Sequence, residues 1–164
     1  MKTLIVEDSA TLCVIYSHYL DGSGLEVTAV ETLAAAREML VELSPQLILL
    51  DIELPDGNGL DLMDDLRGIS PRPAVVVMTG HGADYAEQAI ENGADDFLNK
   101  PFDAARLRVT LLNAADKLAL SQQVESLSVK RERLGPLQGQ SPAMQTVFET
   151  VESLAGTLAT AFVM

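Results

Sequence analysis

Short apolar runs that end abruptly recur along the chain, and they predict the strands of a buried parallel sheet. The clearest is the aliphatic run at residues 47–50, which closes on Asp51 and is followed by Pro55 and Gly57. Such a run is too short for a helix, and its lack of polar alternation is typical of a strand covered on both faces. These runs predict strands at residues 3–6, 47–51, 74–79 and 96–99. Alternation of polar and apolar residues predicts a further strand at residues 25–30.

Segments with helical periodicity separate these strands. Ser9 or Asp8 is placed to cap a helix that runs to about Asp21, and Thr32 is placed to cap a helix over residues 33–43. Further helices are predicted at residues 59–67, 83–91 and 103–134. The last of these has a periodic apolar face made of Leu107, Leu111, Ala114 and Leu118.

The alternation of strands with helices predicts an α/β fold built from right-handed βαβ units. We predict a flavodoxin-like, doubly wound, five-stranded parallel sheet with strand order 2-1-3-4-5 and an extended C-terminal helical linker. In that order the first and third strands are neighbours, so the acidic residues at their carboxyl ends converge. The residues expected at this edge, including those that close the last two strands, are Glu7, Asp8, Asp51, Thr79 and Lys100.

Composition narrows the range of partners. A formal net charge of −13 argues against contact with nucleic acid or an anionic membrane, because phosphate contacts need clustered Lys and Arg. Cys13 is the single cysteine, so no internal disulfide can form, and the first residues lack a secretory signal pattern. No apolar run approaches the roughly 20 residues needed to span a bilayer. We therefore expect a cytoplasmic protein.

Three carboxylates at one sheet edge point to a divalent cation. Unit charges about 4 Å apart interact by about 4 kcal/mol at an effective dielectric constant of about 20, so such a cluster either binds protons or recruits a cation. An acidic, oxygen-only ligand set suits Mg²⁺. An ionised aspartate beside Mg²⁺ is a competent nucleophile toward phosphorus, which makes Asp51 a candidate phosphoacceptor. Lys100 and the Thr79 hydroxyl would stabilise the phosphoryl oxygens.

Over residues 1–120 the chain resembles the receiver domain of bacterial two-component response regulators. The residues that carry the resemblance are Glu7, Asp8, Asp51, Pro55, Gly59, Thr79, Lys100 and Pro101. The resemblance implies that Asp51 accepts a phosphoryl group from a histidine kinase or a histidine phosphotransfer protein.

The same resemblance implies roles for the surrounding residues. It implies Mg²⁺ bound by the carboxylates of Glu7, Asp8 and Asp51 and by the backbone carbonyl of Glu53. It implies that Thr79 acts as a switch residue together with Phe97, which precedes the lysine by three positions. It also implies that the peptide bond between Lys100 and Pro101 is cis.

Residues 137–164 resemble the entry of the AAA+ ATPase domain in NtrC-type, sigma-54-dependent transcriptional activators, LuxO-like proteins among them. We expect a receiver domain at 1–120, a helical linker at 121–136 and an N-terminal piece of an AAA+ domain at 137–164. The sequence contains no G-x-x-x-x-G-K-[ST] phosphate loop, so we expect a regulatory fragment or natural truncation that is not an enzyme. The resemblance implies AAA+ and DNA-binding domains in a longer protein.

The predicted helix at 103–134 would reach about 48 Å at 1.5 Å per residue, longer than the sheet on which it packs. Beyond the receiver it carries a heptad-like seam formed by Leu120, Val124, Leu127, Arg131 and Leu134. We expect a parallel homodimer through this helix. The alternative is an amphipathic linker without a partner, because the seam covers barely two heptads.

Other functions use parts of the same pattern. A haloacid dehalogenase-type phosphatase has a strand-end aspartate with an acid two residues on, here Asp51 and Glu53. In that family, however, the nucleophile normally lies on the first strand and is followed by a Thr or Val pattern that is absent here. A flavin-binding domain of the same fold needs a phosphate loop where Glu7 and Asp8 would repel phosphate. A receiver-like dimerisation module without phosphorylation would not require a complete acidic site.

Overall fold

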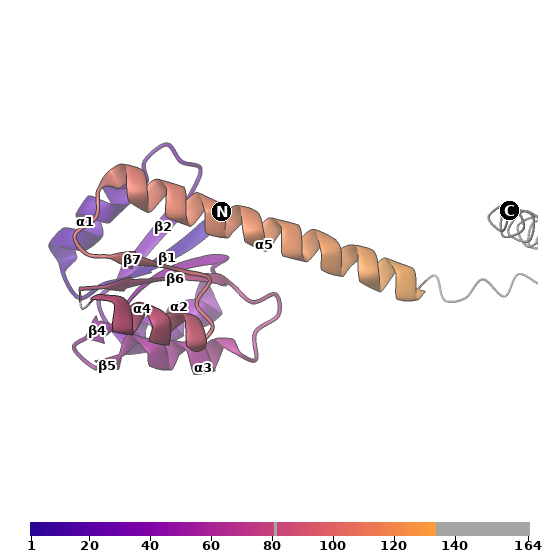
Figure 1. The fold of residues 1–164 in the computed structure, drawn as a ribbon, viewed down its shortest axis with the longest axis horizontal. Helices are drawn as coiled ribbons and strands as arrows, with labels where there is room; N and C mark the ends of the chain where they lie inside the picture. Colours follow the sequence, from indigo (N-terminus) through magenta and orange to yellow (C-terminus); the bar gives the residue numbers. More distant parts are fainter. Residues whose placement is uncertain (81, 134–164) are drawn as a thin grey trace, which may run out of the picture. The chain divides into compact units, whose positions relative to one another are not determined.

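The computed structural model describes residues 1–80 and 82–133 and contains a parallel five-stranded sheet (Figure 1). Its strands are β1 (Lys2–Val6), β2 (Glu26–Val30), β3 (Leu47–Asp51), β6 (Ala74–Thr79) and β7 (Asp96–Asn99). They are arranged in the order β2-β1-β3-β6-β7, with every pair parallel. Counted within this sheet alone, the order is the predicted 2-1-3-4-5, so the flavodoxin-like α/β fold is confirmed.

Helices cover both faces of the sheet. They are α1 (Ala10–Tyr19), α2 (Leu33–Glu42), α3 (Leu62–Leu66), α4 (Gly82–Glu91) and α5 (Ala104–Arg133). Figure 1 shows α1 and α5 on one face and α2, α3 and α4 on the other. The predicted first helix was too long, because the chain turns after Tyr19 through Gly22 and Gly24, both of which have positive φ.

The segment between β3 and α3 differs from the sequence prediction. The helix predicted at 59–67 begins as a 3-10 turn, η1 (Gly59–Asp61), and becomes α3 only at Leu62. Before it lies a hairpin of β4 (Glu53–Leu54) and β5 (Gly57–Asn58), which the sequence analysis did not predict. Strands of two residues carry too little pattern to be recognised.

Two apolar cores lie on opposite faces of the sheet, because successive side chains of a strand alternate between its faces. One core joins the sheet to α2, α3 and α4, and its strand residues include Leu4, Val6, Ile48, Leu50, Val75 and Val77. The other joins it to α1 and α5, and its strand residues include Ile5, Leu47, Leu49, Val76 and Met78. This double burial explains why the central strands are continuously apolar.

Side-chain caps fix where the helices begin. The Ser9 hydroxyl, not the alternative Asp8, accepts a hydrogen bond from the Leu12 N–H at 3.4 Å and caps α1. Thr32 caps α2 as predicted, accepting from the Ala35 N–H at 3.1 Å. Ser9 therefore takes the capping role, and Asp8 can be considered for the site at the end of β1.

The long helix α5 packs through the face predicted for it. Leu107, Leu111 and Ala114 are buried, and Leu118 is partly buried against the same core. Leu120, the first residue of the proposed seam, is 62% exposed. The remaining seam side chains, Val124, Leu127, Arg131 and Leu134, lie outside the described side chains.

The chain separates into two units, Met1–Val124 and Glu125–Met164. The expected AAA+ piece at 137–164 lies outside the described residues. Within the part of the chain that the structure describes, no helix is both long enough and apolar enough to cross a membrane.

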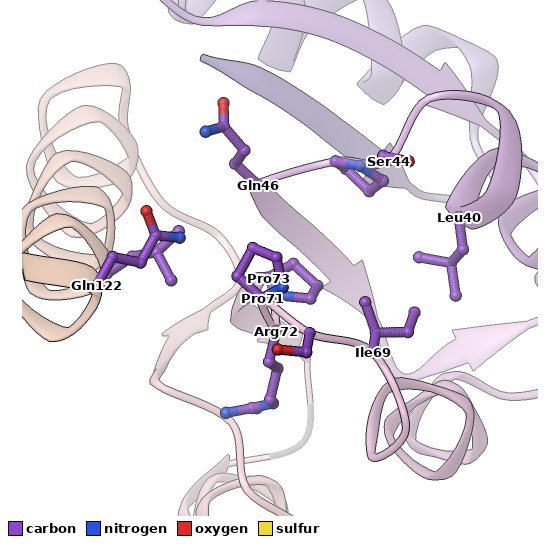
Figure 2. A pocket seen from close by; sticks show the side chains of 11 residues that line it. Leu40, Ser44, Gln46, Ile69, Pro71, Arg72, Pro73 and Gln122 are labelled. Carbon is purple, nitrogen blue, oxygen red and sulfur yellow. The ribbon is translucent and has the colours of Figure 1, made fainter. Parts of the chain in front are cut away.

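A hollow lies at the amino ends of β3 and β6, where Gln46 and Pro73 precede these strands (Figure 2). Leu40, Ile69 and Leu118 contribute to its apolar lining. It therefore lies at the edge of the sheet opposite Asp51.

Candidate functional site

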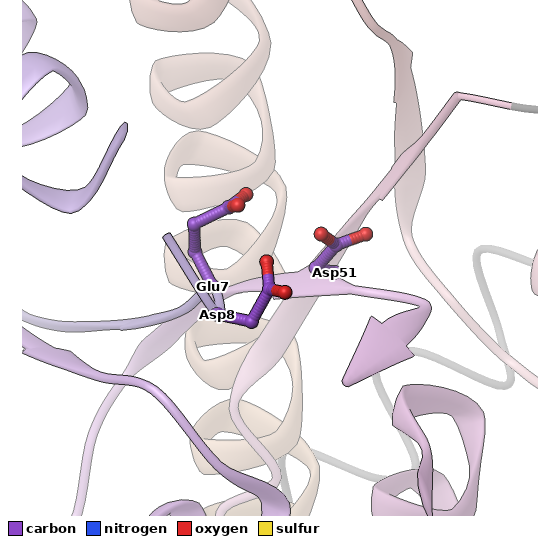
Figure 3. A group of neighbouring side chains, drawn as sticks. All are labelled: Glu7, Asp8 and Asp51. Carbon is purple, nitrogen blue, oxygen red and sulfur yellow. The ribbon is translucent and has the colours of Figure 1, made fainter. Parts of the chain in front are cut away.

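Three carboxylates gather where β1 and β3 end (Figure 3). Val6 and Leu50 pair across these strands, so Glu7, which follows β1, lies beside Asp51, which closes β3. One oxygen from each of Glu7, Asp8 and Asp51 lies within 4.8 Å of the others. Glu7 is 1% exposed and Asp51 is 6% exposed, whereas Asp8 is open to solvent.

A lysine from the end of β7 links two of these acids. Lys100 Nζ donates hydrogen bonds to Glu7 Oε2 and Asp51 Oδ2, both at 2.6 Å. The Lys100 backbone N–H donates to the Thr79 carbonyl oxygen at 2.8 Å, which holds the lysine beside the end of β6. The bond between Lys100 and Pro101 is cis, as the resemblance implied. The two hydrogen bonds from Lys100 Nζ to the carboxylates are charge-assisted, the stronger class of hydrogen bond in proteins.

Burial affects the pKa values of both Glu7 and Lys100. Desolvation raises the pKa of Glu7 above its ordinary value of 4.5, and the hydrogen bond from Lys100 only partly opposes that shift. Desolvation also disfavours charge on Lys100, but its hydrogen bonds to Asp51 and Glu7 outweigh this effect and raise the pKa of Lys100 above 10.5. Lys100 is therefore a fixed positive charge, while the Glu7 carboxylate would be stabilised by a further cation.

The donor set fits Mg²⁺. Three carboxylates and one ammonium group leave an excess of negative charge when the acids are ionised. Every available ligand is oxygen, and the exposed Asp8 opens the cluster to solvent, so an ion there could keep part of its water shell. Mg²⁺ prefers this combination of carboxylate and water ligands.

The loop after β3 lies directly against the backbone of Asp51. A Cβ atom on Gly59 would lie 1.9 Å from the Asp51 carbonyl oxygen and 2.9 Å from its carbonyl carbon. The Gly59 N–H donates to the Ile52 carbonyl oxygen at 2.8 Å and holds this approach. Only glycine fits without displacing the backbone, which gives a physical reason for its place in the family pattern.

The sequence model of the protein family described as response regulator receiver domain matches residues 3–112, well over half of the chain. The chain belongs to this family. Its membership supports the two-component response regulator interpretation, and it does not support the haloacid dehalogenase alternative.

One curated relative matches almost the whole chain. Regulatory protein LuxO of Vibrio cholerae is 38% identical over 161 residues, covering 97% of this chain and 35% of that protein. The chain thus spans about a third of the length of that curated relative. This similarity also confirms the expected relationship to LuxO-like regulators.

Two solved receiver structures are also similar. The signal receiver domain of a putative LuxO repressor protein from Vibrio parahaemolyticus gives a TM-score of 0.71 at 35% identity, covering 76% of this chain and 96% of that chain. The beryllofluoride-activated NtrC4 receiver domain dimer gives a TM-score of 0.67 at 35% identity, covering 71% of this chain and 98% of that chain.

The two expected switch residues of the receiver occupy different surroundings. Thr79 closes β6 next to the acidic cluster and is buried. Phe97 in β7 is partly buried and borders two hollows, one shared with Ile90 of α4 and the other with Arg106 of α5. Phe97 therefore lies between the surfaces of α4 and α5, separate from the carboxylates.

Sequence reasoning missed one residue of the loop that follows the receiver's Asp51. The Asp56 carboxylate accepts hydrogen bonds from the N–H groups of Leu33 and Ala34 at 2.8 and 2.9 Å, so it caps α2 from a distant part of the chain. The Pro55-Asp56-Gly57 stretch indicates a turn, but nothing local to it reveals which helix the turn would meet.

Proposed function

We propose that this receiver takes a phosphoryl group on Asp51 and thereby controls an attached output domain. The observation that carries the proposal is the convergence of Asp51 with Glu7, Asp8 and Lys100 at one edge of the sheet. Asp51 is nearly buried, and Lys100 orients one of its carboxylate oxygens. Family membership supports this chemistry over hydrolysis of a phosphomonoester.

In the proposed transfer from a phosphohistidine, a carboxylate oxygen of Asp51 forms a bond to phosphorus while the phosphorus–nitrogen bond breaks. The imidazole leaves with the electron pair of that bond. Lys100 would exchange its contact with Asp51 for a phosphoryl oxygen, and the Thr79 hydroxyl would donate to another. Mg²⁺, held by the carboxylates of Glu7, Asp8 and Asp51 and by the Glu53 carbonyl, would supply charge neutralisation.

Incubation with acetyl phosphate and Mg²⁺ tests this chemistry, with intact mass as the readout. One phosphoryl group should be added to the unmodified chain and none to Asp51→Asn. Asp64→Asn, which alters an exposed carboxylate of α3, is the matched control and should be labelled normally. Unchanged labelling of Asp51→Asn would refute the phosphoacceptor, and labelling that persists in EDTA would refute the metal requirement.

Phosphorylation should bias Thr79 and Phe97 between two packings, because it adds charge and acceptor oxygens beside the end of β6. The proposal is supported by the position of Phe97 between α4 and α5. Beryllofluoride, a mimic of the phosphoryl group, should therefore change the chemical shifts of both helices. Unchanged shifts there would contradict the switch.

The proposed donor is a histidine kinase or a histidine phosphotransfer protein, and the proposed output is an AAA+ domain with a DNA-binding domain in a longer, sigma-54-dependent regulator. The charge of −13 argues against direct contact of this chain with nucleic acid or membrane. A cytoplasmic location is compatible with the free, buried thiol of Cys13.

The chain should not hydrolyse ATP, and turnover above a protein-free control would contradict this.

We also propose a homodimer through the helix predicted at 103–134. The 62% exposure of Leu120, the first residue of the seam, supports it. The beryllofluoride-activated NtrC4 receiver domain, to which the chain is similar, is a dimer, which supports self-association but no particular interface. Light scattering at micromolar concentration should detect a dimer that Leu127→Glu weakens. Ser126→Glu adds the same charge at a heptad position on the side of the helix away from the seam, so it should leave the dimer intact. A monomer in both phosphorylation states would refute the proposal.

A further inference from the structure

The loop that follows the proposed phosphoacceptor is hydrogen-bonded to the start of α2 through the carboxylate of Asp56. Asp56 Oδ1 accepts from the Leu33 N–H at 2.8 Å, and Oδ2 accepts from the Ala34 N–H at 2.9 Å. Thr32 satisfies the next amide, that of Ala35. Two of the amides that a helix start leaves without partners inside the helix are therefore satisfied from outside it.

Charge strengthens this attachment. The first turn of α2 has the sequence LAAA and carries no charge of its own. The amino end of a helix is electropositive, so a carboxylate placed there is stabilised. The two backbone hydrogen bonds lower the pKa of Asp56 below its ordinary value of 3.8, so both oxygens are acceptors at neutral pH.

The attached loop also contains the proposed carbonyl ligand. Asp56 lies at the turn of the β4–β5 hairpin, in which Glu53 pairs with Asn58. The Glu53 N–H faces Asp51 Oδ1 at 3.4 Å, so the hairpin begins beside the phosphoacceptor. A hairpin with only two residues in each strand is marginal by itself and needs support from its surroundings.

We propose that Asp56 is a positioning residue that holds the β4–β5 hairpin, and with it the Glu53 carbonyl, in the geometry needed for Mg²⁺ binding. The inference rests on the proposed function, since it concerns the same metal site. Asp56 acts through the hairpin and does not itself bind the ion. Binding at the site and order at the start of α2 are therefore coupled through this carboxylate.

The test compares Asp56→Ala with Thr32→Ala, using Mg²⁺ titrations followed by backbone NMR. Both variants remove caps of α2, but only Asp56→Ala removes the hydrogen bonds that join the hairpin to the helix. Asp56→Ala should raise the Mg²⁺ dissociation constant about tenfold, the lower end of the effect seen when groups that orient metal ligands are removed. Thr32→Ala should stay within about twofold, although it removes a helix cap.

Two further readouts separate positioning from general destabilisation. In the unmodified chain, Mg²⁺ should shift the amide resonances of Leu33 and Ala34, and this response should disappear in Asp56→Ala. Asp56→Asn keeps one acceptor oxygen, so its Mg²⁺ affinity should be intermediate. It also carries the test if the alanine variant does not fold.

Equal Mg²⁺ affinities in the unmodified chain and the Asp56 variants would overturn the inference. So would an equal loss in Thr32→Ala, because that result would assign the effect to the α2 cap alone. Failure of the proposed function looks different: the unmodified chain would neither bind Mg²⁺ nor be phosphorylated, and both proposals would fall.

Discussion

Replacing Gly59 with alanine should damage the proposed phosphoacceptor site by displacing its backbone. The added Cβ would lie 1.9 Å from the Asp51 carbonyl oxygen, where real Cβ atoms essentially never come within 3.0 Å. The loop and the end of β3 must therefore separate by about 1 Å, the difference between those distances. The obstructing atom is backbone, so no side-chain rotation can relieve the contact.

This displacement should affect both stability and chemistry. Overpacking in a rigid region costs roughly 1–3 kcal/mol, and a backbone clash belongs at the upper end, so we expect a loss of about 3 kcal/mol in unfolding free energy. A shift of about 1 Å in a reacting group can reduce a rate about 100-fold. Urea unfolding followed by circular dichroism measures the first effect, and labelling by acetyl phosphate measures the second.

Gly68→Ala provides the matched control, because a Cβ there would meet nothing within 4 Å. It should leave the labelling rate unchanged and stability equal or slightly higher, since alanine restricts the unfolded chain. If Gly59→Ala unfolded and reacted like the Gly68 variant, the account of the loop packed against Asp51 would be wrong.

Three more expectations concern buried groups. Burial raises the pKa of Glu7 above 4.5, so as the pH falls Glu7 should become protonated, and Mg²⁺ binding should weaken, at a higher pH than for an ordinary glutamate. The same protonation stabilises the metal-free fold. Glu7→Gln should abolish this part of the pH dependence, as measured by titration calorimetry. Lys100→Met should destabilise the metal-free receiver by about 2 kcal/mol in urea unfolding, less than for a fully buried pair because Lys100 is 21% exposed, and Mg²⁺ should restore part of the loss. Burial raises the pKa of Cys13 to about 11, so iodoacetamide at about pH 8 should modify it far more slowly in the folded than in the unfolded chain, as followed by mass; equal rates would contradict its burial.

Strand prediction succeeded where burial dictated the sequence. The ranges predicted at 47–51, 74–79 and 96–99 match β3, β6 and β7 residue for residue. A central strand covered on both faces has almost no choice but aliphatic residues, and it must end where the chain leaves the core. The second strand lies at the sheet edge with mixed exposure, and its predicted start was one residue early.

The acidic cluster was predictable for a different reason. Once the strands are parallel and the first and third are neighbours, Glu7 and Asp51 must share an edge whatever their side chains do. The contacts of Lys100 and Asp56 depend instead on side-chain conformation and on loops that meet far from each other in sequence. Nothing near position 56 specifies the amides of Leu33 and Ala34 as its partners.

Because Lys100 forms ion pairs with Glu7 and Asp51, the domain should fold without a ligand bound to these acids. A protein whose acids were balanced only by a bound metal would unfold when the metal left, as small zinc domains do. Here an internal ammonium group already lies 2.6 Å from both Glu7 and Asp51. We therefore expect the domain to fold without the proposed metal or phosphoryl group. In the proposed function, phosphorylation of the site can therefore vary without a change in the amount of folded protein.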